Sequence, residues 1–146
     1  LYLEDFRRLL AGVGCLDHRV VSHSKLALTD PAIEQKAGMI GFHSLTVRAF
    51  KLDLEDRCED YGQVAYYLGS VAEQPHGFVL DDHHLFETDQ PQPVCGNTAS
   101  MLSQTRYAPH FKIIGDTSAH YGLFDCEPKS AATGPGDSAT SGGSCC

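Results

Sequence analysis

Six cysteines carry the most chemistry in this chain of 146 residues, because thiolates bind soft metal and metalloid ions and also act as nucleophiles. None belongs to a Cys-x-x-Cys pair, so their spacing predicts neither a zinc ribbon nor a thioredoxin-like site. The chain is large enough for a core and shows no secretory signal, so we expect reduced thiols. The six are Cys15, Cys58, Cys95, Cys126, Cys145 and Cys146.

The surroundings of these cysteines predict different behaviour. Cys15 follows a predicted helix, where an inert, half-buried thiol is expected. Cys58 lies among acidic residues, which raise a thiol pKa and locally favour an inert side chain. Cys95 precedes a predicted helix, whose N-terminus would lower the pKa of the thiol. A functional role and an inert role for Cys95 therefore both stay open. For Cys145 and Cys146, in a flexible Gly/Ser segment, metalloid capture and inert or oxidised states both stay open.

Histidine and aspartate form three further groupings. In residues 81–84, Asp-Asp-His-His, the two histidines would point to opposite faces of a strand and the aspartates suit a turn, so we interpret the segment as a loop–strand junction. No legible nucleophile accompanies the two His–Asp pairings, which we interpret as surface or structural features. These pairings are His110 with Asp116 and His120 with Asp125.

The glycine-rich segment 12–14 is the one candidate for a nucleotide-binding turn. It follows a predicted helix, whereas such a turn joins a strand to a helix, so we interpret it as a helix end. No catalytic or cofactor-binding residue is therefore assigned in this chain.

Hydrophobic periodicity predicts the elements that must position these side chains. Asp30 can cap the second predicted helix, with Pro31 at its first position. In residues 43–52 we expect Leu45, Val47 and Ala49 on a buried face. The pattern favours an α+β fold, mostly an antiparallel meander with two or three helices packed on it. The predicted helices cover 2–13, 31–38 and 98–107, the last capped by Gly96 or Asn97; the strands cover 19–29, 43–52, 62–68, 77–80, 84–87 and 111–114, and 88–93 is a loop.

Composition predicts one folded domain and a tail. Hydrophobic residues make up 42% and charged residues 21%, which is ordinary globular usage, whereas 127–146 are rich in Ala, Ser, Thr, Gly and Pro. We therefore expect a domain over 1–126 and a disordered tail over 127–146. A formal charge of -8 argues against a nucleic-acid partner, and no apolar run is long enough to span a membrane. A cytoplasmic protein is expected.

Several blocks of sequence resemble one family in the same order. They are LYLEDFRRLL at 1–10, SLTVRAFKL at 44–52, EDRCEDYGQ at 55–63, VCGNTASMLSQTRYAPHFKIIGD at 94–116 and SAHYGLFDC at 118–126. Together they resemble the C-terminal domain of arsenite methyltransferases, which transfer methyl groups from S-adenosylmethionine to trivalent arsenic. Because Leu1 is no initiator, the resemblance implies a chain truncated at its N-terminus.

The resemblance also implies roles for particular residues. In the family the cofactor domain comes first, so the S-adenosylmethionine site is expected outside this chain and the fragment is expected to be inactive alone. Cys58 is implied as a thiol ligand of As(III), partnered by a cysteine just before Leu1 and another in the cofactor domain. Cys145 and Cys146 resemble a terminal pair that could capture arsenic. The implied partners are the N-terminal domain, arsenite or thiol-bound arsenicals, and cellular thiol reductants.

Two other functions compete with this interpretation. One is a non-catalytic, thiol-based metalloid-binding module that uses Cys145 and Cys146. The other is a structural interaction domain that docks through the helix face of Leu3, Phe6 and Leu10.

Overall fold

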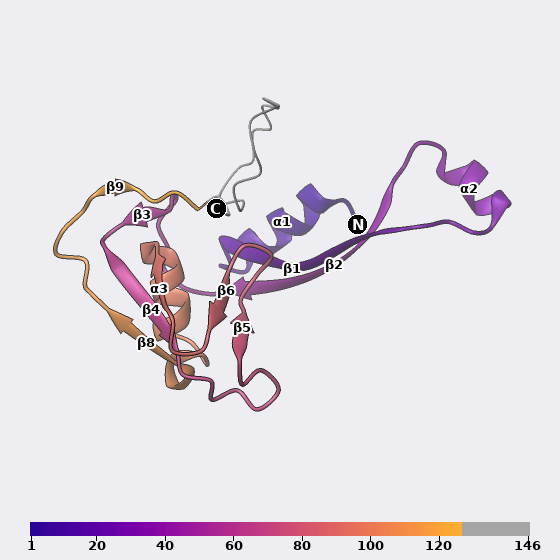
Figure 1. Cartoon of the computed structure of the whole chain (residues 1–146). Coiled ribbons are helices and arrows are strands. Elements are labelled where there is room, and N and C mark those ends of the chain that lie inside the picture. The colour runs from indigo at the N-terminus through magenta and orange to yellow at the C-terminus, as the bar shows by residue number, and fades with distance from the viewer. Residues whose placement is uncertain (127–146) are drawn as a thin grey trace, which may run out of the picture.

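The computed structural model describes residues 1–126 of the chain. They form a body of short strands around one helix, from which a long two-stranded ribbon projects with a further helix at its far end (Figure 1). The predicted disorder of 127–146 lies outside the described residues. The helices are α1 (Leu3–Gly12), α2 (Pro31–Ala37), α3 (Gly96–Ser103) and the short 3₁₀ helix η1 (Ala108–His110), and the strands are β1 (Asp17–Leu26), β2 (Phe42–Phe50), β3 (Glu59–Asp60), β4 (Gln63–Tyr67), β5 (Gly77–Val79), β6 (Leu85–Glu87), β7 (Pro91–Val94), β8 (Phe111–Ile114) and β9 (Gly122–Leu123).

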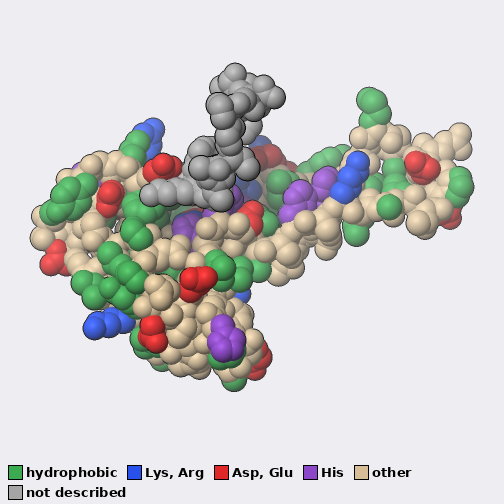
Figure 2. All heavy atoms as spheres, in the orientation of Figure 1, with side chains coloured by type: hydrophobic (Ala, Val, Ile, Leu, Met, Phe, Trp, Pro, Cys, Tyr) green, Lys and Arg blue, Asp and Glu red, His purple; other side chains and the backbone are tan. Residues whose placement is uncertain are grey.

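The ribbon consists of β1 and β2, paired antiparallel from Asp17↔Phe50 to Leu26↔Phe42 with one irregularity between Val20 and Ser22. At its tip α2 begins as the sequence predicts, because the Asp30 carboxylate accepts hydrogen bonds from the amides of Ala32 and Ile33. Apolar side chains stay on the surface along this arm (Figure 2). Those exposed near the tip are Leu26, Ile33, Met39, Ile40 and Phe42.

The buried face predicted for the second ribbon strand is wrong. Leu45 is 37% exposed and Ala49 is also exposed, while Phe50 at the end of β2 is buried. The alternation of apolar and polar residues correctly predicted a strand, because alternation reports backbone geometry. Burial requires a partner layer as well, and on this face only Val47 is half-buried while Leu45 and Ala49 stay exposed.

The body is built on a three-stranded antiparallel sheet with β4 in the centre, β7 on one side and β8 on the other. The predicted α+β class with antiparallel pairing is confirmed. The strands do not form a sequential meander, because β5 and β6 form a separate hairpin and β7 pairs with β4 on the side opposite β8. Residues 88–93 were predicted as a loop, but residues 91–93 belong to β7. Its two prolines are tolerated because β7 is an edge strand of the sheet.

The core lies between this sheet, the β5–β6 hairpin and α3. The inward face of β4 carries Gln63, Ala65 and Tyr67. Five aromatic rings pack edge to face or at a tilt, with the centroids of neighbouring rings 5.0–5.7 Å apart. Such pairs favour one packing arrangement beyond simple area burial. The buried apolar cluster is Phe50, Ala65, Tyr67, Phe78, Leu80, Phe86, Val94, Ala99, Met101, Leu102, Tyr107 and Phe111.

The two helices that flank the ribbon differ from α3 in their packing. None of the residues of α1 or α2 is fully buried, although α1 has the predicted amphipathic pattern. In α1 the Phe6 ring meets His18 of β1 edge-on at 5.9 Å, while Leu3 and Leu9 remain exposed. By contrast, most of α3 is buried, and α3 is the helix that carries residues of the candidate site.

Candidate functional site

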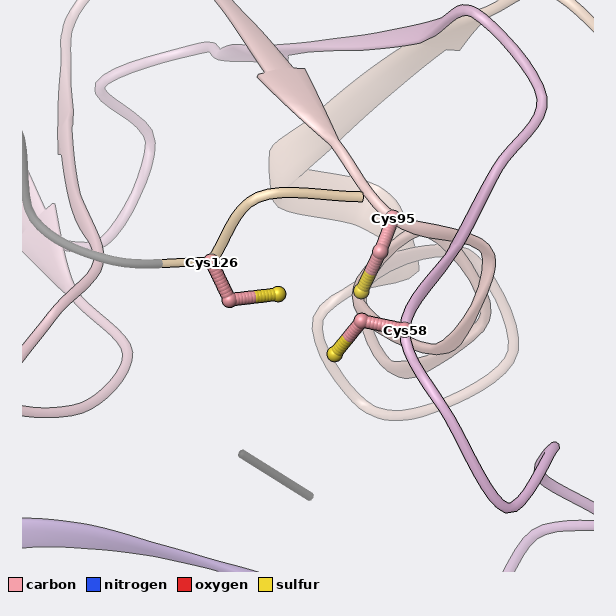
Figure 3. A group of neighbouring side chains, drawn as sticks. All are labelled: Cys58, Cys95 and Cys126. Carbon is pink, nitrogen blue, oxygen red and sulfur yellow. The ribbon is translucent and has the colours of Figure 1, made fainter. Parts of the chain in front are cut away.

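Three cysteines from distant parts of the chain converge at one place. The sulfur atoms of Cys58, Cys95 and Cys126 all lie within 4.8 Å of one another. Cys58 and Cys95 are buried and Cys126 is half-buried. Figure 3 shows the three side chains directed into the same space, Cys126 from one side and the other two from the opposite side. Such an arrangement can bind a soft, thiophilic ion.

Cys95 owes its position to the start of α3. It follows β7 directly and forms the N-cap, where its sulfur accepts a hydrogen bond from the amide of Thr98 at 3.4 Å and lies 3.3 Å from the Thr98 hydroxyl oxygen. The predicted cap, Gly96 or Asn97, is therefore displaced by one residue, because a cysteine sulfur does the work usually done by an oxygen. The helix also ends at Ser103, four residues before the predicted end.

Cys58 is brought to the same helix end by Asn97. The Asn97 carboxamide oxygen accepts a hydrogen bond from the amide of Glu55 at 2.9 Å, and its nitrogen donates to the carbonyls of Glu55 at 2.9 Å and Arg57 at 3.4 Å. These bonds hold segment 55–57, which runs directly into Cys58, against the first turn of α3. Asn97 is 2% exposed, so its bonds are shielded from water.

Gly96 allows this close approach. A β-carbon at this position would lie 2.9 Å from the ring of Tyr61 and 3.2 Å from a carboxylate oxygen of Glu55. The Tyr61 hydroxyl in turn donates a hydrogen bond to Glu55. The loop around Cys58 can therefore close on α3 only where the helix has no side chain.

Cys126 is placed by the pairing of β9 with β3. Gly122 and Leu123 pair with Asp60 and Glu59, and the amide of Phe124 then donates a hydrogen bond to the carbonyl of Cys58 at 2.8 Å. Two residues later the chain reaches Cys126. Neither β3 nor β9 was predicted, because two-residue strands have no periodicity to detect.

The environment of Cys95 favours its thiolate. A hydrogen bond with Cys58 is the largest cause that lowers the pKa of Cys95 to about 5, and burial opposes the shift. The hydroxyl and amide of Thr98 and the charge of Arg19 lower the pKa further. The direction predicted from the helix N-terminus is confirmed, while the main cause, the neighbouring thiol, could not be seen in the sequence.

Arg19 supplies a buried positive charge beside the cluster. Its guanidinium lies 3.1 Å from the carboxylate of Asp17 and 3.5 Å from that of Asp81, with only 11% of its side chain exposed. Burial opposes the charged form, but the two carboxylates and the nearby thiols outweigh it and raise the pKa of Arg19. Sequence reasoning missed this residue, because its neighbours Asp17 and Asp81 stand on separate hairpins.

The structure therefore joins two of the predicted thiols and adds a third. Cys58 and Cys95 were candidates, whereas Cys126 was not, and no short motif links positions so far apart in the chain. Cys145 and Cys146 lie outside the described residues. Cys15 stands apart as a free, half-buried thiol just after α1.

The Asp-Asp-His-His segment is a tight structural turn with mainly internal bonds. The Asp81 carboxylate accepts hydrogen bonds from the amides of His83 at 2.9 Å and His84 at 2.7 Å, and it lies 2.7 Å from Nδ1 of His84. Ligand atoms of the buried Asp81 and of the exposed Asp82 and His83 come within 4.8 Å of one another. The segment joins β5 to β6, in agreement with the predicted loop–strand junction.

The remaining histidines that could act as acids or bases contact other groups. Nδ1 of His110 lies 2.7 Å from the hydroxyl of Ser70, and Nε2 of His120 lies 2.8 Å from a carboxylate oxygen of Glu59. Asp116 accepts a hydrogen bond from the amide of Ser118. These contacts are on the surface. Over residues 1–126, no helix has the length and apolar character needed to cross a membrane.

Comparisons with known proteins agree on one group of relatives. A family model described as the arsenite methyltransferase C-terminal domain matches residues 60–146. The arsenite methyltransferase of Aquipseudomonas alcaligenes is 51% identical over 126 residues, which cover 86% of this chain and 36% of that relative. A crystal structure of an arsenic(III) S-adenosylmethionine methyltransferase from Chlamydomonas reinhardtii matches with a TM-score of 0.80 and 46% identity, over 86% of this chain and 42% of that chain. The chain thus spans well under half the length of either relative.

Proposed function

The chain belongs to the arsenite methyltransferase family and corresponds to its C-terminal domain. From this premise we propose that it is part of an enzyme that transfers methyl groups from S-adenosylmethionine to thiol-bound As(III) and so detoxifies arsenic. The observation that carries the proposal is the convergence of Cys58 with two other thiols in a domain of this family. Trivalent arsenic is a soft centre, and thiolates are the ligands that soft centres prefer.

In this proposal the chain contributes arsenic-binding thiols, with Cys58 as a ligand, and other parts of the enzyme bind the cofactor. The glycine-rich segment 12–14 closes α1, where Gly14 has a φ of +86°, as is usual at a helix C-terminus. This agrees with its interpretation as a helix end. We accordingly propose that the S-adenosylmethionine site belongs to the region that the longer relatives have in addition.

The partner proposed for this chain is that cofactor domain. The outer face of α1 offers it a surface, since Leu3 is 57% exposed and Leu9 and Val13 are each 61% exposed. Cellular thiol reductants would keep the cluster reduced and present arsenic as thiol-bound species. The alternative of a structural interaction domain was predicted to use Leu3, Phe6 and Leu10, of which Phe6 already packs on His18.

A second candidate is a thiol-based arsenic-binding module without catalysis. It is favoured by one observation, that three thiols converge within the described residues of this one chain. A binding module needs no methyl donor. Measuring whether methylated arsenicals are released distinguishes the enzyme from the binding module.

The test is to join this chain to the upstream region of the Aquipseudomonas alcaligenes relative, with which it shares 51% identity. Given arsenite, S-adenosylmethionine and a thiol reductant, we expect the chimera to release methylated arsenicals and the chain alone to release none. Cys58→Ser should lower the turnover of the chimera at least ~10-fold, because it removes a proposed arsenic ligand. Cys15→Ser is the matched control and should leave turnover unchanged.

Two outcomes would contradict the proposal. If the chain alone methylated arsenite, the proposal that the S-adenosylmethionine site lies outside this chain would be wrong. A folded chimera that binds S-adenosylmethionine and arsenite but yields no methylated product would favour the binding module.

A further inference from the structure

We propose that a hollow at the C-terminal end of α3 binds a small molecule with two or more carboxylate or phosphate groups. The hollow has a volume of about 490 Å³ and is lined by residues 47–52, where β2 ends, and by residues 104–107, which follow α3. Cys95 stands at the other end of the same helix, so the hollow is separate from the thiol cluster. The proposal does not depend on the function proposed above.

Three cations line this hollow, and its lining contains no carboxylate. The cations are Arg48, Lys51 and Arg106. Within residues 1–126 none of the three forms an ion pair, whereas Arg19 is paired with two carboxylates. The whole chain has a formal charge of -8, so three unpaired cations in one place are a local excess of positive charge. A bound anion would balance this excess.

Two of the cations are held in place by one buried aromatic ring. The guanidinium carbon of Arg48 lies 5.9 Å from the centre of the Tyr107 ring, and that of Arg106 lies 5.2 Å from it. Arg106 also donates a hydrogen bond of 3.1 Å to the Tyr107 hydroxyl. Arg48 donates to the carbonyls of Val79 and Leu80. Both guanidinium groups are therefore ordered before a ligand arrives, which lowers the entropic cost of binding.

The end of α3 repels an anion less than a bare helix end would. A helix C-terminus is negative because its last carbonyls lack partners within the helix. Here the carbonyl of Ala99 accepts a hydrogen bond of 2.7 Å from the Ser103 hydroxyl. The carbonyl of Met101 accepts one of 2.6 Å from the Thr105 hydroxyl. The positive charges of the hollow therefore outweigh the partial negative charge of the helix end.

The size and charge of the hollow define the class of ligand. Its volume lies within the range of small-molecule pockets, which is roughly 300–1,000 Å³. Guanidinium groups bind carboxylates and phosphates through paired hydrogen bonds, and three positive charges suit a dianion or a trianion. A nucleic acid is a poor fit, because the net charge of the chain opposes a long polyanion.

The experiment titrates the full 146-residue chain, kept reduced, with pyrophosphate and with citrate by isothermal titration calorimetry. KCl holds the ionic strength constant, because salt screens exposed charges. We expect saturable binding of one anion per chain; tighter pyrophosphate binding would identify a phosphate ligand and tighter citrate binding a carboxylate ligand. Lys51→Gln and Arg106→Gln should each weaken binding at least ~10-fold, because each removes a charged donor. Arg106→Lys keeps the charge but loses the planar fork, so it should weaken binding less than Arg106→Gln.

A matched control locates the site. Lys36→Gln removes the same charge from α2, at the far end of the ribbon (Figure 1), and should leave the affinity unchanged. Lys51 and Arg106 are exposed, so their variants are expected to keep the fold, which circular dichroism checks. Absence of saturable binding for both anions would overturn the proposal. So would an unchanged affinity in Arg106→Gln, or an equal loss of affinity in Lys36→Gln.

Discussion

The side chain of Asn97 and the backbone of Glu55 exchange two hydrogen bonds of 2.9 Å each, which fasten the segment before Cys58 to the first turn of α3. This contact holds Cys58 near Cys95, because Cys58 is three residues from Glu55 and Cys95 is two residues from Asn97. The thiol cluster therefore depends on a residue that has no thiol chemistry of its own.

Asn97→Ala is expected to destabilise the fold by about 2 kcal/mol, because it leaves the buried backbone groups of Glu55 without their partners. Arsenite affinity should fall as well, since Cys58 is no longer held beside Cys95. Urea unfolding and arsenite titration measure the two effects. Gln104→Ala at the other end of α3, where the side chain is exposed, should change neither.

Gly96→Ala is expected to lower stability by about 1–3 kcal/mol, because its new β-carbon would overlap the Tyr61 ring at 2.9 Å. Gly12→Ala is the matched control, since nothing lies within 4 Å of a β-carbon there and Gly12 is a residue of α1, where alanine is favoured over glycine. Thermal unfolding of both variants should give a lower melting temperature for Gly96→Ala than for Gly12→Ala. Equal melting temperatures would show that the loop around Tyr61 moves aside freely.

Cys95 should be a thiolate at neutral pH, because its pKa is lowered to about 5 from an ordinary value of 9.0. A folded-state pKa below the unfolded one means that the thiolate stabilises the fold fully above pH 9, and that this stability is lost as the pH falls toward 5. Thiolate absorbance followed during acid titration should fall in one step as Cys95 is protonated. This loss of absorbance should be absent in Cys95→Ser and persist in Cys15→Ser.

Acid should destabilise the turn between β5 and β6 through Asp81. Burial alone would raise the pKa of Asp81, but the hydrogen bond from His84, the amide of His83 and the charge of Arg19 hold it below its ordinary value of 3.8. The unfolded chain therefore binds this proton more tightly, so the stabilisation present above pH 3.8 is lost as the pH falls below it. Urea unfolding should show this acid loss in the native chain and in Asp82→Asn. A native acid slope that persisted in Asp81→Asn would refute the assignment.

Local chemistry in the sequence was enough to predict the elements that depend on neighbouring residues. The Asp30 cap with Pro31 predicts α2, the period of apolar residues predicts α1, and alternation predicts both strands of the ribbon, as found. The reduced pKa of Cys95 follows in direction from its place before α3. In each case the cause lies within a few residues of its effect.

The sequence by itself thus determined the α+β class, the family and two candidate thiols, Cys58 and Cys95. Tertiary structure alone decided that Leu45 and Ala49 of β2 stay exposed, because burial needs a second layer. It also decided the site, since pairing of β3 with β9 and the bonds of Asn97 bring Cys126 and Cys58 to Cys95 across distant parts of the chain. Ligand convergence is a property of side-chain positions in space, and chain spacing carries no record of it unless the ligands share one element.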